Sequence, residues 1–278
     1  MNILLLSQFF STTRGGGEYV FSLLAKNLSE NGHKVWVITN KISGEDYKIH
    51  DNINLVFVKP DLEYKGGLPP SFQDNIKYML NTISSGLKMV KKEKIDIIHS
   101  NNFSPAIAGS ILSYLTSKPH ITSIWDIFSL CGNDYWDKWT KQIGVSKIHS
   151  FLGPRFEKLI LNLPHDAIHT ISEASQNDLT KFGAKKPIYM IPPTIEESKP
   201  TASNFNSTQF VYVGRLVFYK NIEVIIKAIK IVIEVESKIK LVIVGGGPHE
   251  KILKDLVLQL DLGSNVQFMG YVATDEKE

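Results

Sequence analysis

The sequence predicts an α/β fold built from two domains, each with a parallel sheet. Short apolar runs rich in Val and Ile alternate with longer segments whose hydrophobic residues recur at helix spacing. Glycine clusters directly follow two of these runs or their loops, at 15–17 and 245–247. A length of 278 residues suits two domains that each bury a core of their own.

The first domain is expected to span residues 1–192. Its predicted strands lie at 3–6, 35–39, 53–58, 95–99, 121–124, 167–171 and 188–191, and its predicted helices at 20–28, 75–92, 105–115, 151–161 and 173–182. Ser172 is an expected N-cap, and Gly32 is the expected stop of the first helix. The glycine- and proline-rich stretch 60–71 is expected to be a loop, and 125–150 shows no clear period.

Residues 193–208 are expected to be a linker, because the prolines at 192 and 193 are followed by a polar tract. The second domain then repeats the alternation, with strands at 210–213, 240–244 and 266–269 and helices that end near Ile233 and Leu260. Three strands leave a sheet edge and helix faces without partners, so we expect residues 209–278 to be an incomplete domain.

The stretch 210–221 carries the strongest chemical signal. An apolar, β-branched run, typical of a strand buried on both faces, breaks at Gly214 and is followed by Arg215 and Lys220. The carboxyl ends of parallel strands are where open α/β sheets bind ligands, and the next helix adds its positive dipole end. A planar guanidinium and a mobile ammonium suit a diphosphate. Two solvated surface cations are the alternative interpretation.

The glycine loop at 15–17 is the second signal, because its backbone can approach a ligand closely where a helix begins. A nicotinamide dinucleotide site is a weaker alternative. Val20 stands where the third glycine of that fingerprint belongs, and the second strand ends Thr39-Asn40-Lys41 without a ribose-binding acid. A loop without a ligand is also possible.

Composition excludes several classes. A net charge of +3 is too small to indicate a nucleic-acid partner. The single cysteine, Cys131, allows no intrachain disulfide and no cysteine-based metal cluster, and we expect neither a metal nor a cofactor. No apolar run reaches the length of a membrane span, and residues 1–6 are interpreted as a strand, not a signal peptide. We expect a cytoplasmic location.

Several other side chains have two interpretations. His99 ends a strand and either faces a cleft or serves the core. Cys131 is expected to be a small buried hydrophobe. Tyr135, Trp136 and Trp139 either pack a long loop or stack on a sugar or membrane interface. Lys88, Lys91, Lys92 and Lys94 either end a solvated helix or contact anionic lipid at the cytoplasmic membrane face.

Seven segments, in the right order, resemble the motifs of the retaining glycosyltransferases of family GT4. They are Gly16-Gly17-Glu18, Asp96–Ser100, Thr122–Cys131, Ile171–Glu173 with Gly183, Val213–Leu216 with Lys220, Val242–Pro248 and Val266–Val272.

The resemblance implies a GT-B fold, with two Rossmann-like domains facing a cleft, and transfer of a sugar from a nucleotide-diphosphate donor to a glycan or lipid-linked acceptor. Arg215 and Lys220 would bind and stabilise the departing diphosphate. The other donor-binding residues that it implies are Gly16, Gly17, Glu18, Gly214, Gly246, Met269, Gly270 and Tyr271. The acceptor side would include His99, Trp125 and Asp126, and Asp126 is the candidate for a catalytic polar contact.

Two departures from the family pattern matter. Trp125 stands where the family often has His before Asp126. The family's E-x7-E donor segment would lie after Glu278, so the resemblance implies a chain truncated at its C-terminus. A glycosyltransferase-like binding or scaffold protein without turnover is therefore the alternative function.

Overall fold

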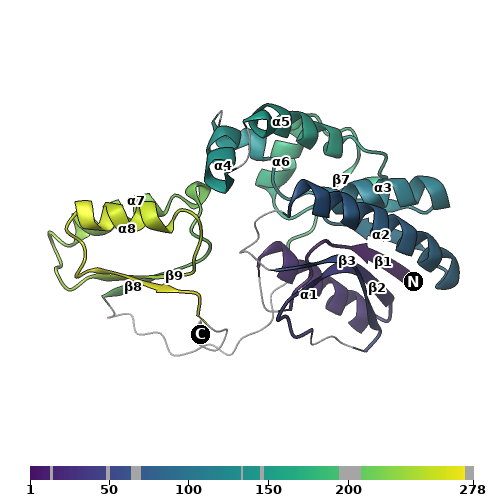
Figure 1. Ribbon diagram of the computed structural model, residues 1–278, viewed down its shortest axis with the longest axis horizontal. Coiled ribbons are helices and arrows are strands. Elements are labelled where there is room, and N and C mark those ends of the chain that lie inside the picture. Colours follow the sequence, from purple (N-terminus) through teal and green to yellow (C-terminus); the bar gives the residue numbers. More distant parts are fainter. Residues whose placement is uncertain are drawn as a thin grey trace. The chain divides into compact units, whose positions relative to one another are not determined.

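The computed structural model describes residues 1–12, 15–47, 51–63, 70–132, 134–144, 147–193 and 208–272. The chain divides into two compact units (Figure 1). Unit 1 comprises Met1–Trp136 and Ile148–Glu196, and unit 2 comprises Asp137–Lys147 and Glu197–Glu278. Residues 194–207 of the predicted linker and 64–69 of the predicted loop lie outside the described residues.

The first 192 residues contain every strand and helix that the sequence predicts, with small shifts of their ends. The strands are β1 (Asn2–Leu6), β2 (Lys34–Ile42), β3 (Ile53–Leu62), β4 (Ile97–Ser100), β5 (His120–Ser123), β6 (Ala167–Thr170) and β7 (Ile188–Met190). The helices are α1 (Gly17–Glu30), α2 (Phe72–Lys92), α3 (Ser104–Thr116), α4 (Tyr135–Ile143), α5 (Ile148–Leu161) and α6 (Glu173–Phe182), with a 3₁₀ turn η1 (Phe128–Leu130). The stretch 125–150, which has no clear period, therefore contains η1, α4 and the start of α5.

All seven strands of unit 1 are parallel, in the order β3-β2-β1-β4-β5-β6-β7. The chain runs outward from β1 to β3 and then returns to place β4 on the other side of β1. The carboxyl ends of β1 and β4 thus form a topological switch point, where sheets of this kind bind ligands.

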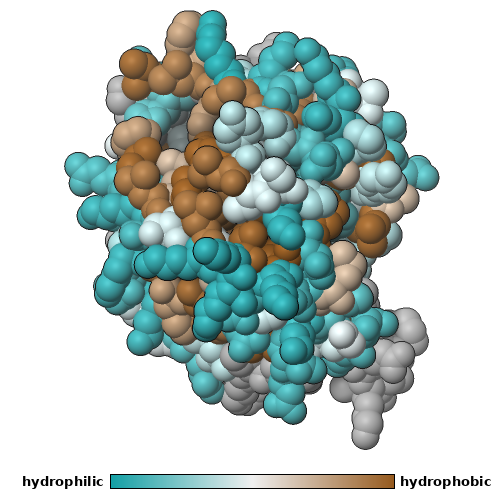
Figure 2. Space-filling model, turned by 90° about the vertical axis from the view of Figure 1, so that its right-hand side faces the viewer, coloured by the Kyte–Doolittle hydropathy of each residue, from teal (hydrophilic) through white to brown (hydrophobic). Residues whose placement is uncertain are grey.

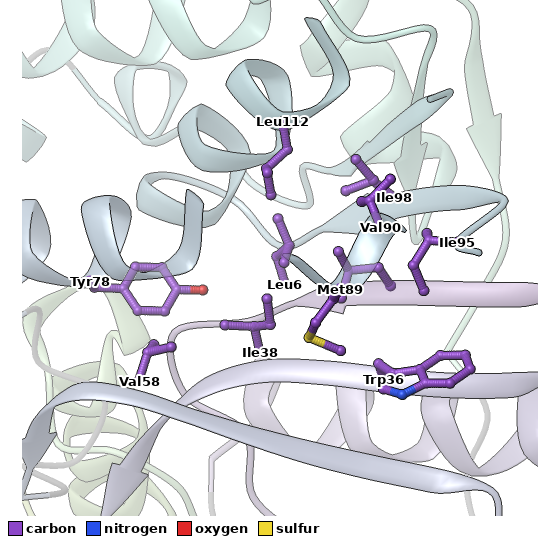
Figure 3. Packing of buried hydrophobic residues seen from close by; sticks show 11 residues of the cluster. Leu6, Trp36, Ile38, Val58, Tyr78, Met89, Val90, Ile95, Ile98 and Leu112 are labelled. Atoms are coloured by element: carbon purple, nitrogen blue, oxygen red, sulfur yellow. The ribbon is translucent and has the colours of Figure 1, made fainter. Parts of the chain in front are cut away.

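Alternating side chains of the strands enter two hydrophobic layers. Leu4, Leu6 and Ile38 point to the side that α2 and α3 cover, where they meet Met89 and Leu112 (Figures 1 and 3). Ile3, Leu5, Val35 and Val37 point to the opposite side, where they pack on Phe21 and Ala25 of α1. The strand period of two places successive residues on opposite faces, so both layers are specified by one short run.

The predicted start and end of α6 are confirmed in atomic detail. The Ser172 hydroxyl accepts a hydrogen bond from the Ser175 N–H at 3.1 Å, which is the expected N-cap contact. Gly183 closes the helix with φ of 99°, the left-handed conformation that glycine adopts without a Cβ clash.

Unit 2 contains a three-stranded parallel sheet in the order β10-β9-β8. Its elements are β8 (Gln209–Val213), the 3₁₀ turn η2 (Phe218–Lys220), α7 (Ile222–Val232), β9 (Lys240–Val244), α8 (Glu250–Gln259) and β10 (Val266–Gly270). The helix-spaced residues Ile222, Ile226 and Ile229 are buried against Leu241 and Ile243, as predicted.

The prediction that β8 is buried on both faces is wrong for the described residues. Phe210, Val211 and Val213 are all exposed. The crossovers from β8 to β9 and from β9 to β10 run in the same direction, and right-handed crossovers of that kind place their helices on one face. Figure 1 shows α7 and α8 on the same side of this sheet, so Val211 and Val213 lie on the side that these helices leave open.

Some large hydrophobic side chains of unit 1 are also exposed. Figure 2 shows hydrophobic side chains gathered into a patch bordered by hydrophilic ones on the face that it presents. Exposed examples on the helices of unit 1 are Phe72 and Leu80 of α2, Tyr114 and Leu115 of α3, and Ile148, Phe151, Leu152 and Leu159 of α5. Within the described residues, no helix combines the length and hydrophobicity of a membrane span.

Candidate active site

At the switch point of unit 1, α1 begins with Gly17 directly beside Trp125. A Cβ added to Gly17 would lie 3.1 Å from Cζ3 of the Trp125 ring, tighter than an ordinary van der Waals contact, whereas one added to Gly16 would meet nothing within 4 Å. Glu18 lies in the first turn of the same helix. The predicted glycine loop thus ends at a helix N-terminus, and of the two glycines only Gly17 leaves space that a neighbouring side chain, that of Trp125, occupies.

Trp125 is held at this edge by two aromatic neighbours, one of which contacts a third ring. Its ring lies 5.9 Å from that of Phe21 and 6.4 Å from that of His169, and Phe21 lies 5.7 Å from His99. Among the described residues, the Trp125 indole N–H is buried without a hydrogen-bond partner. Such an orphaned donor costs about 1–3 kcal/mol, which is recovered when an acceptor atom reaches it.

A chain of hydrogen bonds crosses the carboxyl ends of β4, β5 and β6. The Ser123 hydroxyl lies 2.8 Å from Nε2 of His99 and 2.8 Å from Nδ1 of His169, and His169 Nε2 lies 3.0 Å from the carbonyl oxygen of Ile191. Burial, with a smaller contribution from His169, lowers the pKa of His99 to about 3, and burial also lowers the pKa of His169. Both rings are therefore neutral at pH 7 and link the strand ends as dipoles.

Asp126 follows Trp125 and is exposed. It lines a small hollow with Asn102, Phe103 and Glu157, above a floor of Ile124, Ile127 and Ile160. A carboxylate at the rim of an apolar hollow is placed to accept a hydrogen bond from a hydroxyl-bearing ligand.

Glu157 of α5, which sequence reasoning missed, holds the loop after Asp126. Its buried carboxylate accepts the N–H groups of Phe128 and Ser129 at 2.8 and 2.9 Å and also the Ser129 hydroxyl. That hydroxyl accepts the indole N–H of Trp136 at 3.0 Å. Burial raises the pKa of Glu157, while these donors favour its ionised form. No sequence motif signals this role.

Phe103 is a second residue that the sequence did not indicate. It precedes α3 with φ of 62° and ψ of −122°, a conformation that is strained for a bulky side chain. Its ring is stacked at 6.3 Å on both Phe128 and Phe156, which holds the backbone in that conformation at the edge of the hollow.

Two of the three aromatic residues that had two interpretations, Tyr135 and Trp136, serve packing in this structure. Tyr135 is buried and stacks on Phe128 at 5.1 Å, and Trp136 fills the space above Gly153, where a Cβ would lie 2.4 Å from its ring. Cys131, which we expected to be buried, is exposed, because it follows η1 at the surface end of the loop.

In unit 2, the carboxyl ends of the three strands are tied together through their backbones. The N–H of Gly214 bonds the carbonyl of Val244, the N–H of Leu216 bonds the carbonyl of Gly246, and the N–H of Gly245 bonds the carbonyl of Gly270 at 2.7 Å. Gly214, Gly246 and Gly270, all predicted donor-binding residues, thus lie at one edge.

Glycine is required at this edge for steric reasons. Gly245 has φ of 126°, and a Cβ there would lie 2.0 Å from the carbonyl oxygen of Gly214. At Gly247 a Cβ would lie 2.3 Å from the carbonyl oxygen of Leu216. The run 245–247 therefore serves the close approach of two backbone segments.

Tyr271 completes this edge and Met269 lies beside it. The Tyr271 hydroxyl donates to the Gly246 carbonyl at 3.3 Å, and its ring lies over Gly246, yet the side chain is largely exposed. Met269 is also exposed. An exposed aromatic ring above a glycine offers a flat surface for a nucleobase.

Arg215 and Lys220 stand where the sequence predicts, in the loop between β8 and α7. Arg215 is half-buried and its carbonyl accepts the Tyr212 hydroxyl at 3.1 Å, whereas Lys220 is exposed at the end of η2. Asn221, with φ of 50°, then turns the chain into α7. Lys220 thus lies two residues before α7, at the positive end of the helix dipole, which attracts anions.

A buried imidazole that the sequence did not indicate supports the same loop. His249 precedes α8, pairs through Nε2 with Glu223 in the first turn of α7, and lies 3.4 Å through Nδ1 from the Gln142 amide. Its backbone N–H bonds the Leu216 carbonyl at 2.9 Å. Contacts between α7 and the start of α8 therefore hold the loop that carries Arg215 and Lys220 in place.

The two groups of predicted residues are each assembled in their own unit. Gly17, His99 and Trp125 gather at the switch point of unit 1, and Gly214, Arg215, Gly246, Gly270 and Tyr271 gather at the strand ends of unit 2. Among the described residues, no group of three or more His, Cys, Asp or Glu side chains is arranged to hold a metal ion.

A seven-stranded parallel sheet with a topological switch point, and a second parallel sheet with a glycine-lined edge, define an α/β protein of two Rossmann-like units. The chain belongs to Glycosyltransferase Family 4, whose family pattern matches residues 14–199, and the Glycosyl transferases group 1 pattern matches residues 194–278.

Two curated relatives cover most of the chain. An uncharacterised glycosyltransferase of Methanocaldococcus jannaschii is 24% identical over 266 residues, which are 91% of this chain and 64% of that protein. The alpha-monoglucosyldiacylglycerol synthase of Streptococcus pneumoniae is 23% identical and covers 91% of this chain and 57% of its own length. The chain thus spans less than two thirds of the length of either relative.

Solved structures confirm the GT-B fold. The sucrose-phosphate synthase of Thermosynechococcus elongatus matches with a TM-score of 0.75 and 17% identity, over 98% of this chain and 71% of that one. HepE of Anabaena, in complex with UDP-glucose, matches with a TM-score of 0.65 and 16% identity, over 98% and 70%.

Proposed function

We propose that this chain transfers a sugar, with retention of configuration at its anomeric carbon, from a nucleotide-diphosphate donor to a glycan or lipid-linked acceptor. The observation that carries the proposal is the edge of unit 2. There, glycine backbone groups hydrogen-bond the ends of three strands to one another, and Arg215 and Lys220 lie in the loop that follows the first of these strands. The solved structure of HepE with UDP-glucose and the diacylglycerol named for the pneumococcal relative support the donor and acceptor classes.

In this proposal, unit 2 binds the donor. When the bond between the anomeric carbon and the phosphate oxygen breaks, the diphosphate leaves with the electron pair, and Arg215 and Lys220 offset its growing charge. The hydroxyl oxygen of the acceptor bonds to the anomeric carbon on the face that the diphosphate leaves, and its proton passes to the departing diphosphate. Charge-assisted hydrogen bonds of this kind are worth about 1.5–3 kcal/mol each, and more where they form only in the transition state. Gly246 and Gly270 let the donor approach the backbone, and Met269 and Tyr271 border its base.

Unit 1 contributes the acceptor side and the glycine loop. Gly16, Gly17 and Glu18 open α1, whose N-terminal N–H groups are suited to an anion. Asp126 accepts a hydrogen bond from a hydroxyl of the sugar or acceptor. His99 and Trp125 form the wall beside it. Burial keeps His99 neutral, and the contact of its Nε2 with the Ser123 hydroxyl orients the ring.

The test is an Arg215→Ala variant compared with Lys238→Ala, which removes an exposed cation just before the amino end of β9. With UDP-glucose and other nucleotide sugars as probes, we expect Arg215→Ala to lose transfer by at least about a hundredfold and to weaken donor binding, since it removes stabilisation of a developing charge. Lys238→Ala retains activity. Transfer that survives Arg215→Ala unchanged contradicts the proposal. Proton NMR of the product determines whether configuration is retained.

A binding protein without turnover is the second candidate, and Trp125 favours it. Its bulky ring lies against Gly17 where the family pattern often has His. Turnover by the unaltered chain, including slow donor hydrolysis, excludes this candidate. Donor binding without turnover, followed by turnover in Trp125→His, supports it.

A further inference from the structure

Helix α5 carries hydrophobic side chains on two opposite faces. At about 100° per residue, Gly153, Glu157, Ile160 and Leu161 share one face and are buried in unit 1. The opposite face carries Ile148, Phe151, Leu152 and Leu159, all of which are exposed.

The exposed hydrophobic residues of α5 are grouped on this outer face and are not scattered over the surface. Phe151 is 62% exposed and Leu159 is 57% exposed, and Phe156 lies at the margin of the same face. Single exposed hydrophobic residues are ordinary, but several on one face of a short helix mark a surface that binds a partner.

The charges on α5 indicate what kind of partner this is. Arg155 lies within the apolar face, where its guanidinium sits 3.7 Å above the Phe151 ring and donates to the Phe151 carbonyl at 2.7 Å. Lys158 borders the face beside Phe151 and is exposed. The helix has one acidic residue, Glu157, and that carboxylate is buried on the inner face.

We propose that the outer face of α5 docks on a membrane surface that contains anionic lipid. An apolar face with basic side chains in it and beside it, without an exposed acid, matches helices that lie in the plane of the headgroup region. The aliphatic part of the Arg155 side chain stays with the apolar residues while its charge reaches the phosphate groups.

The inner face of α5 connects this surface to the candidate acceptor side. Glu157 binds the N–H groups of Phe128 and Ser129, two and three residues after Asp126. A helix that docks on lipid therefore also positions the loop beside the hollow. A lipid-linked acceptor would then be presented next to Asp126. This step rests on the proposed function, in which the acceptor is linked to a lipid.

The test is co-flotation of the chain with vesicles of phosphatidylcholine, with and without phosphatidylglycerol. We expect the unaltered chain to float with the anionic vesicles. Phe151→Ser with Leu159→Ser lowers its vesicle partition coefficient at least about tenfold, because two apolar side chains no longer leave water. Arg155→Gln lowers partition about fivefold on anionic vesicles and has little effect on neutral ones.

The matched control is Ile231→Ser with Leu258→Ser, which removes two comparably exposed side chains, 68% and 71%, from α7 and α8 of unit 2. Its partition should equal that of the unaltered chain, and circular dichroism should show that both double variants keep their helix content.

The proposal is overturned if the unaltered chain does not float, or if the α5 double variant floats as well as the unaltered chain. It is also overturned if sedimentation shows a dimer that only the α5 variant dissociates, since a second copy then covers this face. No donor or sugar enters these measurements. A chain that binds vesicles but transfers no sugar retains this inference and loses the proposed function.

Discussion

The candidate sites of the two units are built in opposite ways. In unit 2 the edge consists of backbone, with glycines at 214, 245–247 and 270 and two cations in the adjoining loop. In unit 1 the edge consists of large side chains. The rings of Phe21, His99, Trp125 and His169 pack on one another, and Trp125 contacts Gly17. In the proposed function, unit 2 binds phosphate, which requires accessible backbone N–H groups and positive charge. Unit 1 contacts the acceptor, which requires a surface of complementary shape.

This difference decides what the sequence can reveal. Gly214, Arg215 and Lys220 lie within seven residues of one another, so a local pattern predicts their edge of the sheet. His169 joins the site of unit 1 through Ser123, 46 residues earlier in the chain, and Glu157 binds backbone 28 and 29 residues away. Such contacts depend on the tertiary fold, and no spacing in the sequence announces them.

The same distinction explains the errors in the fold. The continuous apolar run of β1, interpreted as a strand, is covered on both faces, because strands on both sides of it carry crossovers to both faces. Val211 and Val213 have the same composition but lie on the open side of their sheet. Composition records what a strand is able to bury, whereas topology determines which faces are covered.

The largest effect that separates the two edges is expected at Gly245. Gly245→Ala places a Cβ about 2 Å from the Gly214 carbonyl oxygen at φ of 126°, so the strand ends of unit 2 must separate. We expect the free energy of unfolding of unit 2 to fall by at least about 3 kcal/mol, measured by urea denaturation. Gly263→Ala is the control, since a Cβ there meets nothing within 4 Å, and it should change stability by less than about 0.5 kcal/mol. Equal stability of the two variants would show that the glycine edge is not sterically required.

A smaller effect is expected from acid, and it is expected in unit 1. Burial lowers the pKa of both His99 and His120 to about 3, whereas an unfolded histidine takes up a proton near pH 6.5. Below pH 6.5 the two histidines are therefore protonated in the unfolded chain but remain neutral in the folded chain. The free energy of unfolding falls as the pH drops toward 3. These two rings should cost unit 1 about 2 kcal/mol between pH 6.5 and 5.5.

Denaturation of the chain at several pH values measures this slope, with the transition of unit 1 followed separately. His120→Gln should remove about 1 kcal/mol of this loss whatever it does to absolute stability, because His99, His165 and His169, whose pKa values burial also lowers, still titrate. A slope that is the same with and without His120 would mean that the ring is charged in the folded protein, contrary to its burial among Ser100, Ser110 and Thr122.

The smallest effect is expected at Gly17, and it sharpens the contrast with Gly245. A Cβ at Gly17 lies 3.1 Å from the Trp125 ring, a contact that a side chain relieves by moving a few tenths of an ångström, whereas a carbonyl in a tied strand end does not move. Alanine also favours the helix by about 0.5–1 kcal/mol over glycine, which offsets the crowding. We expect Gly17→Ala to leave stability within about 0.5 kcal/mol of the unaltered chain and to shift the fluorescence of Trp125, while Gly16→Ala, with open space around its Cβ, shifts neither. If Gly17→Ala destabilises unit 1 as strongly as Gly245→Ala destabilises unit 2, the wall at the switch point is as rigid as the backbone edge, and the contrast between the two sites fails.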